Sequence, residues 1–273
     1  YKFNHPKGQG QKSHILKTAI PKEYKGKYED KDTPGALYAK EAIEQLNRNE
    51  NGLAAFIAEP IVGCGGQVPL ASGYLKALYP EIRKKGGLCI SDEVQTGFGR
   101  LGSVFWGFEL HGVIPDMVVL GKPMANGHPM GAVVTSEEVA ASFAEGVEFF
   151  SSFGGNPVSC AIGKAVLEVI DEEKLQKNAL EVGKYYRSLL KELQKEDARI
   201  GDVRGEGLFL GVELINEHEK PNTELAQLLK NELRNRHVLI STDGPADSVI
   251  KTKPPILFTK SNAERVVSEI RRA

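Results

Sequence analysis

The sequence predicts an α/β fold, in which a mainly parallel sheet covered by helices is followed by a smaller C-terminal α+β domain. Continuous apolar runs alternate with amphipathic stretches through most of the chain, which is typical of parallel strands separated by helices. Charged residues follow several of these runs directly, as they do where strands end at a binding site. A chain of 273 residues is long enough to bury a large core.

Each helix and strand of the larger domain is predicted from a local sequence pattern. Residues 1–36 are polar, rich in Lys, Gly and Pro, and without periodicity, so we expect an irregular surface connection there. One apolar run ends at Glu59-Pro60, where the proline stops regular pairing, and one amphipathic stretch ends at Gly86-Gly87. These patterns predict helices at 36–49, 70–85 and 136–144 and strands at 53–58, 88–91, 116–120 and 131–135.

Two helices are expected at the end of the larger domain. Asn156 and Pro157 suit the cap and the first turn of the first helix. Apolar residues at helical spacing are predicted to form its buried face: Val158, Ala161, Ile162, Ala165, Val166 and Val169. The second helix is expected from Leu175 to Leu193.

A domain boundary is expected near Asp197, which divides the chain into residues 1–196 and 197–273. The first part is the larger domain and the second is a small α+β unit. Strands are predicted at 208–214, 238–241 and 249–256, and helices at 223–236 and 262–271.

Composition excludes several classes of partner. The formal net charge of -1 at pH 7 does not favour binding to nucleic acid or to an anionic membrane. No apolar run approaches the length of a membrane span, and the first residues do not resemble a signal peptide, so we expect a cytoplasmic protein. The three cysteines are widely spaced, so neither a disulfide framework nor a metal site is predicted.

Asp92 and Lys122 are the leading candidates for catalysis. Asp92 follows the apolar run at 88–91, and Lys122 follows the run at 116–120. Such a pair is what pyridoxal phosphate (PLP) requires, because the lysine amine condenses with the cofactor aldehyde while the carboxylate keeps the pyridine nitrogen protonated. A single lysine after a strand is usually a solvated chain end, so the prediction depends on the pair.

Three stretches of the sequence resemble the signatures of the class III PLP-dependent aminotransferases. They are SDEVQTGFGR at 91–100, the Gly121-Lys122 segment and SFGGNP at 152–157, and they occur in the order found in that family. The resemblance runs from about residue 57 to about residue 270 and implies the PLP fold type I. Further stretches, at 127–130, 149–160 and 241–245, are most similar to the ethanolamine-phosphate and phosphohydroxylysine phospho-lyases and to the alanine-glyoxylate aminotransferases of mitochondrial type.

The resemblance implies roles for several residues near the cofactor. Lys122 would bind PLP and move the substrate proton, and Asp92 would pair with the ring nitrogen. Val94 would lie against the ring, where a core valine is the alternative, and Gln95 would reach the phenolic oxygen. Ser152 would reach the phosphate of the PLP bound in the partner subunit, which implies a homodimer with shared active sites.

Three more residues match positions that surround the family's active site. Glu59 would line it on the cofactor side and Gln67 on the substrate side, although a Glu before Pro is more often a loop carboxylate. Arg100 is expected to form a salt bridge at the turn of its motif. Glu59 directly follows the apolar run at 53–58.

Lys251 is the candidate for substrate binding. It stands where many family members carry an arginine that binds a carboxylate through two parallel hydrogen bonds. A lysine offers a point charge that suits a phosphate, and a solvated strand lysine is the equally weighted alternative.

The resemblance implies amino transfer between an amine or amino acid and an oxo acid. The alternative within the family is a phospho-lyase that eliminates phosphate from a phosphorylated amine. A third interpretation is a non-catalytic subunit or an inert fragment. It arises because the family's N-terminal portion, with its phosphate-binding turn, has no counterpart in this sequence, so the PLP domain would be N-terminally incomplete.

Overall fold

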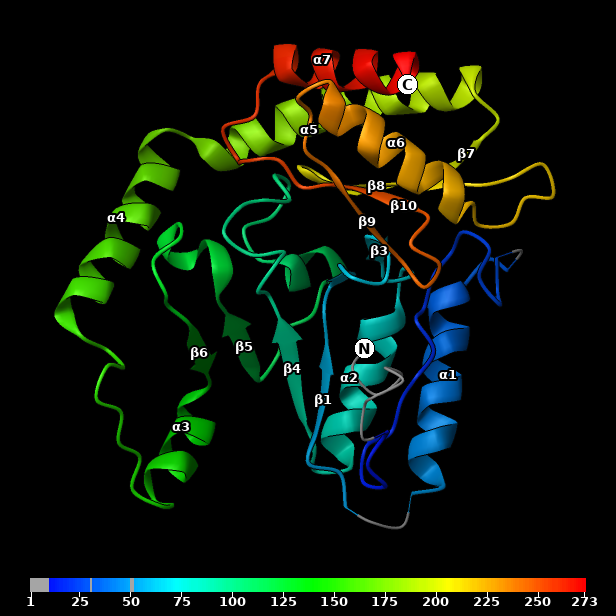
Figure 1. Ribbon diagram of the computed structural model, residues 1–273. Helices are drawn as coiled ribbons and strands as arrows, with labels where there is room; N and C mark the ends of the chain where they lie inside the picture. The colour runs from blue at the N-terminus through cyan, green and yellow to red at the C-terminus, as the bar shows by residue number, and fades with distance from the viewer. Residues whose placement is uncertain (1–9, 30, 50–51) are drawn as a thin grey trace.

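The computed structural model describes residues 10–29, 31–49 and 52–273, which form two units built on separate sheets (Figure 1). Helices α4 (Pro157–Glu172) and α5 (Leu175–Glu196) run from the larger unit to the smaller one. The described part of residues 1–36 contains turns and bends up to the start of the first helix, as predicted, and residues 1–9 and 30 lie outside the described ranges.

Four strands form the sheet of the larger unit. In spatial order they are β1 (Ala55–Ala58), β4 (Leu88–Asp92), β5 (Met117–Leu120) and β6 (Ala132–Thr135). The first three are parallel, whereas β6 runs antiparallel to β5. The predicted mainly parallel sheet is therefore confirmed.

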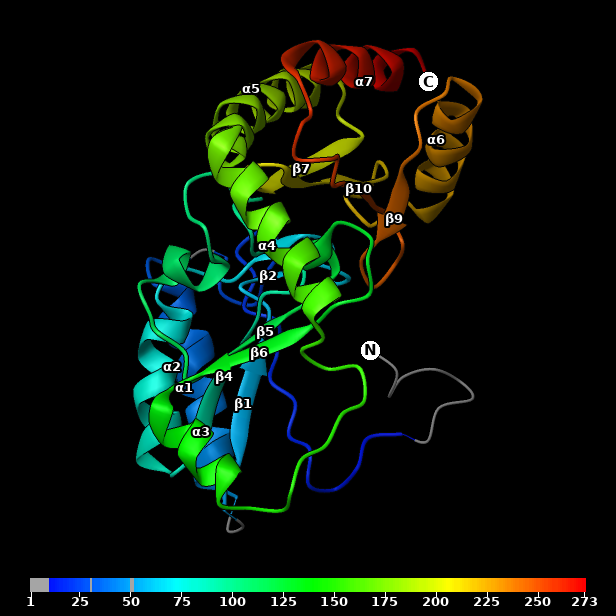
Figure 2. The same cartoon turned by 90° about the vertical axis from the view of Figure 1, so that its left-hand side faces the viewer.

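Helices α1 (Pro34–Asn47) and α2 (Tyr74–Lys84) pack against one face of this sheet (Figure 2). α2 begins later than predicted because Gly73 adopts a left-handed conformation, with φ of 84°, that cannot continue a helix backwards. The opposite face is more open, since Ile57 of β1 is 59% exposed. The connection from α3 (Glu137–Ala144) to α4 passes on that open side (Figure 2).

The prediction of a buried apolar face on α4 is wrong for the isolated chain. Asn156 caps the helix as expected, with its Oδ1 accepting the Ser159 N–H at 3.0 Å. Of the helix residues only Gly163 is buried, while Val158 is 66% and Val169 is 43% exposed. The reason is that α4 stands away from the sheet and packs mainly on α5 and on the short 3-10 helix η3 (Lys122–Ala125).

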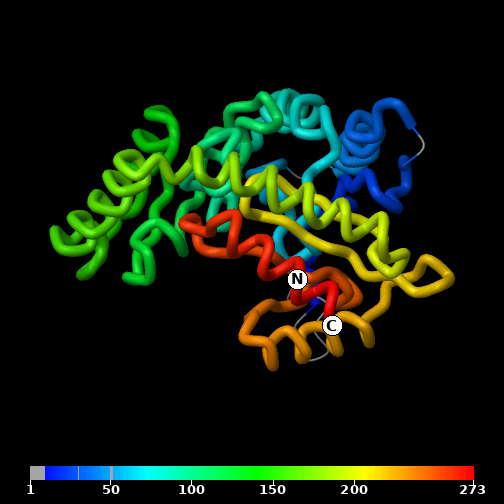
Figure 3. Tube along the Cα trace, turned by 90° about the horizontal axis from the view of Figure 1, so that it is seen from above, coloured from blue at the N-terminus to red at the C-terminus, as the bar shows by residue number. Residues whose placement is uncertain are grey.

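The smaller unit is an antiparallel sheet with three helices on one face. Its strands, in spatial order, are β7 (Ile200–Glu206), β8 (Phe209–Leu214), β10 (Val249–Thr252) and β9 (Ser241–Asp243). α5, α6 (Thr223–Asn235) and α7 (Lys260–Arg272) cover them, with α5 and α7 side by side when seen from above (Figure 3). β7 was not predicted, and β10 is shorter than expected because Pro254 and Pro255 end it.

The two units are joined by a small hairpin that the sequence did not predict. Its strands are β2 (Ile61–Val62) and β3 (Val68–Pro69), and β3 lies beside β7 of the smaller unit. A second 3-10 helix, η2 (Gly107–His111), follows β4.

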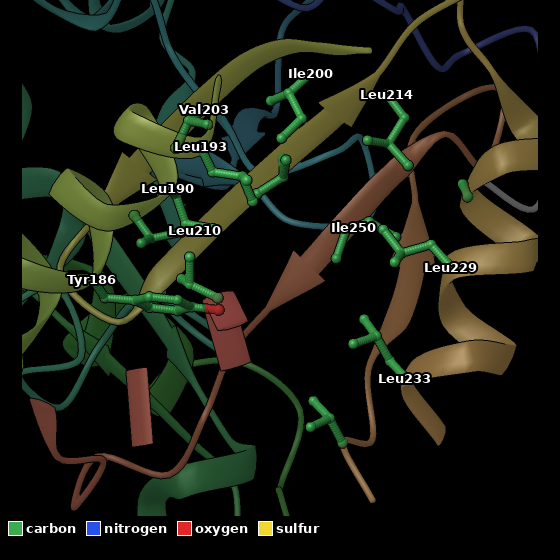
Figure 4. Packing of buried hydrophobic residues seen from close by; sticks show 14 of the residues in the cluster. Tyr186, Leu190, Leu193, Ile200, Val203, Leu210, Leu214, Leu229, Leu233 and Ile250 are labelled. Carbon is green, nitrogen blue, oxygen red and sulfur yellow. The ribbon is translucent and has the colours of Figure 1, made fainter. Parts of the chain in front are cut away.

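One apolar core holds the smaller unit together. Figure 4 shows Tyr186 and Leu190 of α5 beside Leu210 of β8, and Leu229 of α6 beside Ile250 of β10. Since α5 contributes to this core, the helix packs with the second sheet although it precedes residue 197. The division into residues 1–196 and 197–273 stays a prediction.

Leu233→Ala should lower the free energy of unfolding by about 2–5 kcal/mol, because the side chain is fully buried and its removal leaves a cavity. Leu228→Ala is the matched control on the same helix. Its side chain is 64% exposed, so we expect a change within about 0.5 kcal/mol. Urea unfolding measures both, and equal losses would contradict the packing of α6.

Candidate active site

Three charged residues lie at the carboxyl ends of adjacent strands. Glu59 follows β1, Asp92 is the last residue of β4, and Lys122 lies two residues beyond β5. β1 pairs with β4 along its whole length, and β4 pairs with β5 up to Asp92, opposite Val119. Because these strands are parallel, their ends meet at one edge of the sheet, as predicted.

Glu93 fixes the turn that follows β4. Its side chain is fully buried, and each carboxylate oxygen accepts two hydrogen bonds. Oε1 accepts from Ser91 Oγ at 3.1 Å and from the Phe108 N–H at 2.8 Å. Oε2 accepts from Thr96 Oγ1 at 2.6 Å and from the Gly107 N–H at 2.8 Å. A buried carboxylate with its lone pairs satisfied in this way ties the turn firmly to η2.

Asp92, Val94 and Lys122 converge beside this turn. Asp92 is half-buried, and its Oδ1 accepts the Val94 N–H at 3.1 Å. A Cβ placed on Gly121 would lie 3.6 Å from each γ-carbon of Val94, so Val94 packs next to the residue that precedes Lys122. Lys122 has an exposed side chain and a φ of 37°, a left-handed conformation that is uncommon outside glycine and often found at functional sites.

Glu59 and Gln95 form a second contact at the same edge. Glu59 Oε2 accepts the Gly63 N–H at 3.1 Å and Gln95 Nε2 at 3.3 Å. Burial raises the pKa of Glu59 above its ordinary value, and the charge of Asp92 raises it further, although the hydrogen bond from Gly63 opposes this. A Cβ on Gly63 would lie 2.5 Å from Gln95 Nε2, so a larger residue there would displace the Gln95 amide.

The small sheet presents its open face to these strand ends. Ile250 belongs to the core under the helices, and the alternation along β10 directs Lys251 to the other face. Lys253 follows directly after the strand. Lys251 is ion-paired on the open face, with its Nζ 3.0 Å from both carboxylate oxygens of Asp243.

Gln67 joins the turn of the β2–β3 hairpin to the small sheet. Its side chain is fully buried, and its Nε2 donates to the Gly63 carbonyl at 2.9 Å and to Asp243 Oδ2 at 2.8 Å. Its Oε1 is buried without a hydrogen-bond partner among the residues that the structure describes. Gln67 and Lys251 therefore share the same carboxylate, and the structure brings these two predicted residues together.

Lys253 is a site residue that the sequence analysis did not identify. Its Nζ donates to Gln95 Oε1 and lies 5.2 Å from the centre of the Phe209 ring. Burial lowers the pKa of Lys253, and the charge of Lys251 lowers it further. The sequence did contain a signal for it: Lys251 and Lys253 are two positions apart, which places both on one face of an expected strand.

Arg100 does not form the expected salt bridge. Its Nη1 donates to the carbonyl oxygens of Leu208 at 3.1 Å and Pro254 at 2.8 Å. Within the described ranges, none of the ion pairs involves Arg100, and burial lowers its pKa. The guanidinium therefore links the units through backbone contacts rather than through a carboxylate.

Ser152 is not brought to the strand ends in this chain. It lies in the exposed stretch between α3 and α4, beside Phe150 and Phe153, which are 82% and 84% exposed. Its predicted role concerns a cofactor in a partner subunit, so that role stays a prediction.

The residues at the strand ends suit PLP chemically. Only one oxygen of Asp92 is engaged by the Val94 N–H, and a carboxylate has further capacity to accept a ring N–H.

Among residues 10–29, 31–49 and 52–273, no cluster of three or more His, Cys, Asp or Glu side chains could hold a metal ion. In the same part of the chain, no helix is long and apolar enough to cross a bilayer.

Comparison with known proteins gives consistent matches. The family model described as "Aminotransferase class-III" matches residues 4–273. Alanine–glyoxylate aminotransferase 2-like of Drosophila melanogaster is 48% identical over 276 residues, which cover 97% of this chain and 56% of that protein. The human protein named alanine–glyoxylate aminotransferase 2, mitochondrial, is 43% identical over 225 residues, which cover 81% of this chain and 44% of its own.

A solved structure of a phospholyase from Arthrobacter in complex with phosphoethanolamine is also similar to this chain. The TM-score is 0.90 at 38% identity, and the match covers 96% of this chain and 63% of that one. The chain spans about half the length of the curated relatives that it matches.

Glu93→Gln should lower the free energy of unfolding by about 2–4 kcal/mol, because an amide nitrogen would then face donors that need an acceptor. Glu109→Gln is the control, since that exposed carboxylate also accepts two backbone N–H groups, from Phe105 and Trp106, but stands in water. We expect it to cost less than about 1 kcal/mol. Denaturant unfolding compares the two, and a loss at Glu93 no larger than at Glu109 would show that the buried network is dispensable.

Proposed function

Because the chain belongs to the class III aminotransferase family, we propose that it carries the catalytic lysine and the ring-nitrogen carboxylate of a PLP-dependent enzyme. The proposed reaction moves an amino group between an amine or amino acid and an oxo acid. The observation that supports it best is the convergence of Asp92 and Lys122 at the ends of paired parallel strands. When bound, PLP supplies an aldehyde that captures the amine and a ring that accepts electrons.

Lys122 holds the cofactor and moves the substrate proton in this proposal. In the described part of the chain, its Nζ has no hydrogen bond or ion pair, and the side chain is exposed. The amine can therefore bind a carbonyl carbon and, once displaced by substrate, accept and return a proton.

Asp92, Val94 and Gln95 position the ring. Asp92 keeps the ring nitrogen protonated, and the hydrogen bond from the Val94 N–H orients its carboxylate. The Val94 side chain supports the ring face, while Gln95 reaches the ring oxygen. Glu59, which accepts a hydrogen bond from the Gln95 amide, keeps that side chain in place.

A phospho-lyase is the second candidate function. It is favoured by the lysine at position 251, where an arginine would bind a carboxylate, and by the similarity to the Arthrobacter phospholyase. Lys122 and Asp92 would serve the same purposes, but the substrate would lose phosphate instead of exchanging its amine. The third interpretation, a non-catalytic subunit or inert fragment, requires that Lys122 takes up no cofactor.

The proposed enzyme is a homodimer with shared active sites. The apolar side chains exposed along α4 and the stretch before it support this, because soluble proteins rarely leave such a surface open. Ser152 lies within that surface, where it would face the partner's cofactor. We keep the cytoplasm as the proposed location, with mitochondria as the alternative that the name of the human relative suggests.

Reduction with borohydride in the presence of PLP should attach a pyridoxyl group to Lys122, which mass spectrometry of peptides can locate. Lys122→Ala should lose the visible absorbance of the bound cofactor and all turnover, because its amine is the covalent attachment point. Lys177→Ala, a change at an exposed lysine of α5, should lose neither. A label on a lysine other than Lys122 would overturn the assignment.

Two assays on the same PLP-loaded protein separate the two reactions. Transfer from alanine to glyoxylate or pyruvate is expected if the enzyme is an aminotransferase, and release of inorganic phosphate from phosphoethanolamine is expected if it is a lyase. We expect transamination to be measurable and to disappear in Lys122→Ala. Phosphate release without transamination would replace the first proposal by the second.

A further inference from the structure

A cavity of about 610 Å³ lies between η3, α4 and the segment that follows β10. The turn after β4 closes it on a further side. Small-molecule sites in proteins commonly have volumes of about 300–1,000 Å³, so a ligand of modest size fits this space. Of the described residues that line it, none is Asp92 or Lys122, so the cavity is separate from the candidate active site.

Helix α4 supplies an apolar wall of the cavity. Ile162, Val166 and Ile170 are spaced four residues apart, so they share one face of the helix, and each is only partly buried. Nearer the start of the helix, a ring nitrogen of His128 lies 2.7 Å from Ser159 Oγ, which ties α4 to the segment after η3. The apolar face is therefore held beside the cavity without being covered.

The remaining walls are fixed by contacts of their own. Asn178 of α5 donates through Nδ2 to the carbonyl oxygens of Ile256 at 2.8 Å and Phe258 at 3.1 Å. Phe98, in the turn after β4, packs edge-on against Trp106 with the ring centres 5.2 Å apart. Ile256 and Phe98 both line the cavity, so the space is part of the fold and not a gap between loose loops.

Arg100 brings a positive charge to this apolar lining. Its Nη1 donates to the carbonyl oxygens of Leu208 and Pro254, whereas its Nε and Nη2 have no hydrogen-bond partner among the residues that the structure describes. No Asp or Glu in the described ranges lines the cavity. A partly buried guanidinium is costly without a counter-ion, and its planar fork of N–H groups matches a carboxylate.

We propose that this cavity binds a small monocarboxylate with an apolar body. Its carboxylate would accept hydrogen bonds from Arg100, and its hydrocarbon part would lie against Ile162, Val166 and Ile170. Charge complementarity favours this occupant, because a neutral apolar molecule leaves the guanidinium without an anion and a small polar anion leaves the apolar wall uncovered. Pro123 lines the cavity, so the ligand would contact the segment that directly follows Lys122. The inference goes beyond the proposed function and does not depend on it.

Calorimetric titration of the PLP-loaded protein with octanoate tests this site. Octanol, which lacks the charge, and acetate, which lacks the chain, are the comparison ligands, and each should bind about tenfold or more weakly than octanoate. Arg100→Met should weaken octanoate binding by about 10- to 100-fold, as expected for the loss of charge-assisted hydrogen bonds, and Arg100→Lys should restore part of it.

A second variant tests the cavity without changing Arg100, which also links the two units. Val166→Phe should fill the space and abolish octanoate binding. Glu168→Phe is the matched control, because that residue lies on the same helix but is exposed and does not line the cavity. It should bind octanoate as the wild type does, and thermal unfolding midpoints near that of the wild type would show that the variants are folded.

Several results would overturn the proposal. Equal affinity for octanoate and octanol, or unchanged octanoate binding in Arg100→Met, would remove the role of Arg100. Loss of octanoate binding in Lys251→Met but not in Val166→Phe would place the ligand at the strand ends. No octanoate binding, together with an oligomer that dissociates in Val166→Phe but not in Glu168→Phe, would assign the cavity to a second copy of this chain.

Discussion

The candidate site depends on one buried carboxylate, that of Glu93. It stands between Asp92 and Val94, and its two oxygens collect four hydrogen bonds from the turn after β4 and from η2. A carboxylate taken out of water is costly unless such donors surround it, so the donors and the charge hold one another in a single arrangement. Because the neighbouring residues share this backbone, the direction of Asp92 and the contact between Val94 and Gly121 follow from it.

The second constraint is the set of backbone contacts between the two units. The turn of the β2–β3 hairpin is held from the smaller unit by Arg204, whose Nε donates to the Gly66 carbonyl at 2.8 Å, and by the Gly244 N–H, which donates to the Cys64 carbonyl at 3.2 Å. Arg100 crosses in the opposite direction to Pro254. These backbone contacts bring Lys253 next to Gln95, so the site combines residues whose relative positions are set by both units rather than by either sheet alone.

Much of the fold was predictable because periodicity reports burial directly. The strands that end at Asp92 and near Lys122 are short apolar runs, and their parallel pairing places both residues at one edge. The burial of α4 was mispredicted because an apolar stripe shows that a helix face favours burial but does not show which segment would pack against it. Val158 remains exposed. Glu93, Arg100 and Lys253 were not recognised for their contacts because these join segments far apart in the sequence. Local patterns cannot show that a glutamate meets η2 or that a strand lysine reaches Gln95.

The central claim is that Asp92 and Lys122 act on one cofactor from neighbouring strand ends. Nitrogen NMR of the protein loaded with PLP labelled with ¹⁵N in the ring measures this most directly, because the chemical shift reports whether the ring nitrogen carries a proton. A protonated nitrogen at neutral pH in the wild type and an unprotonated one in Asp92→Asn is the predicted result. The same shift in both proteins would contradict the pairing of Asp92 with the ring.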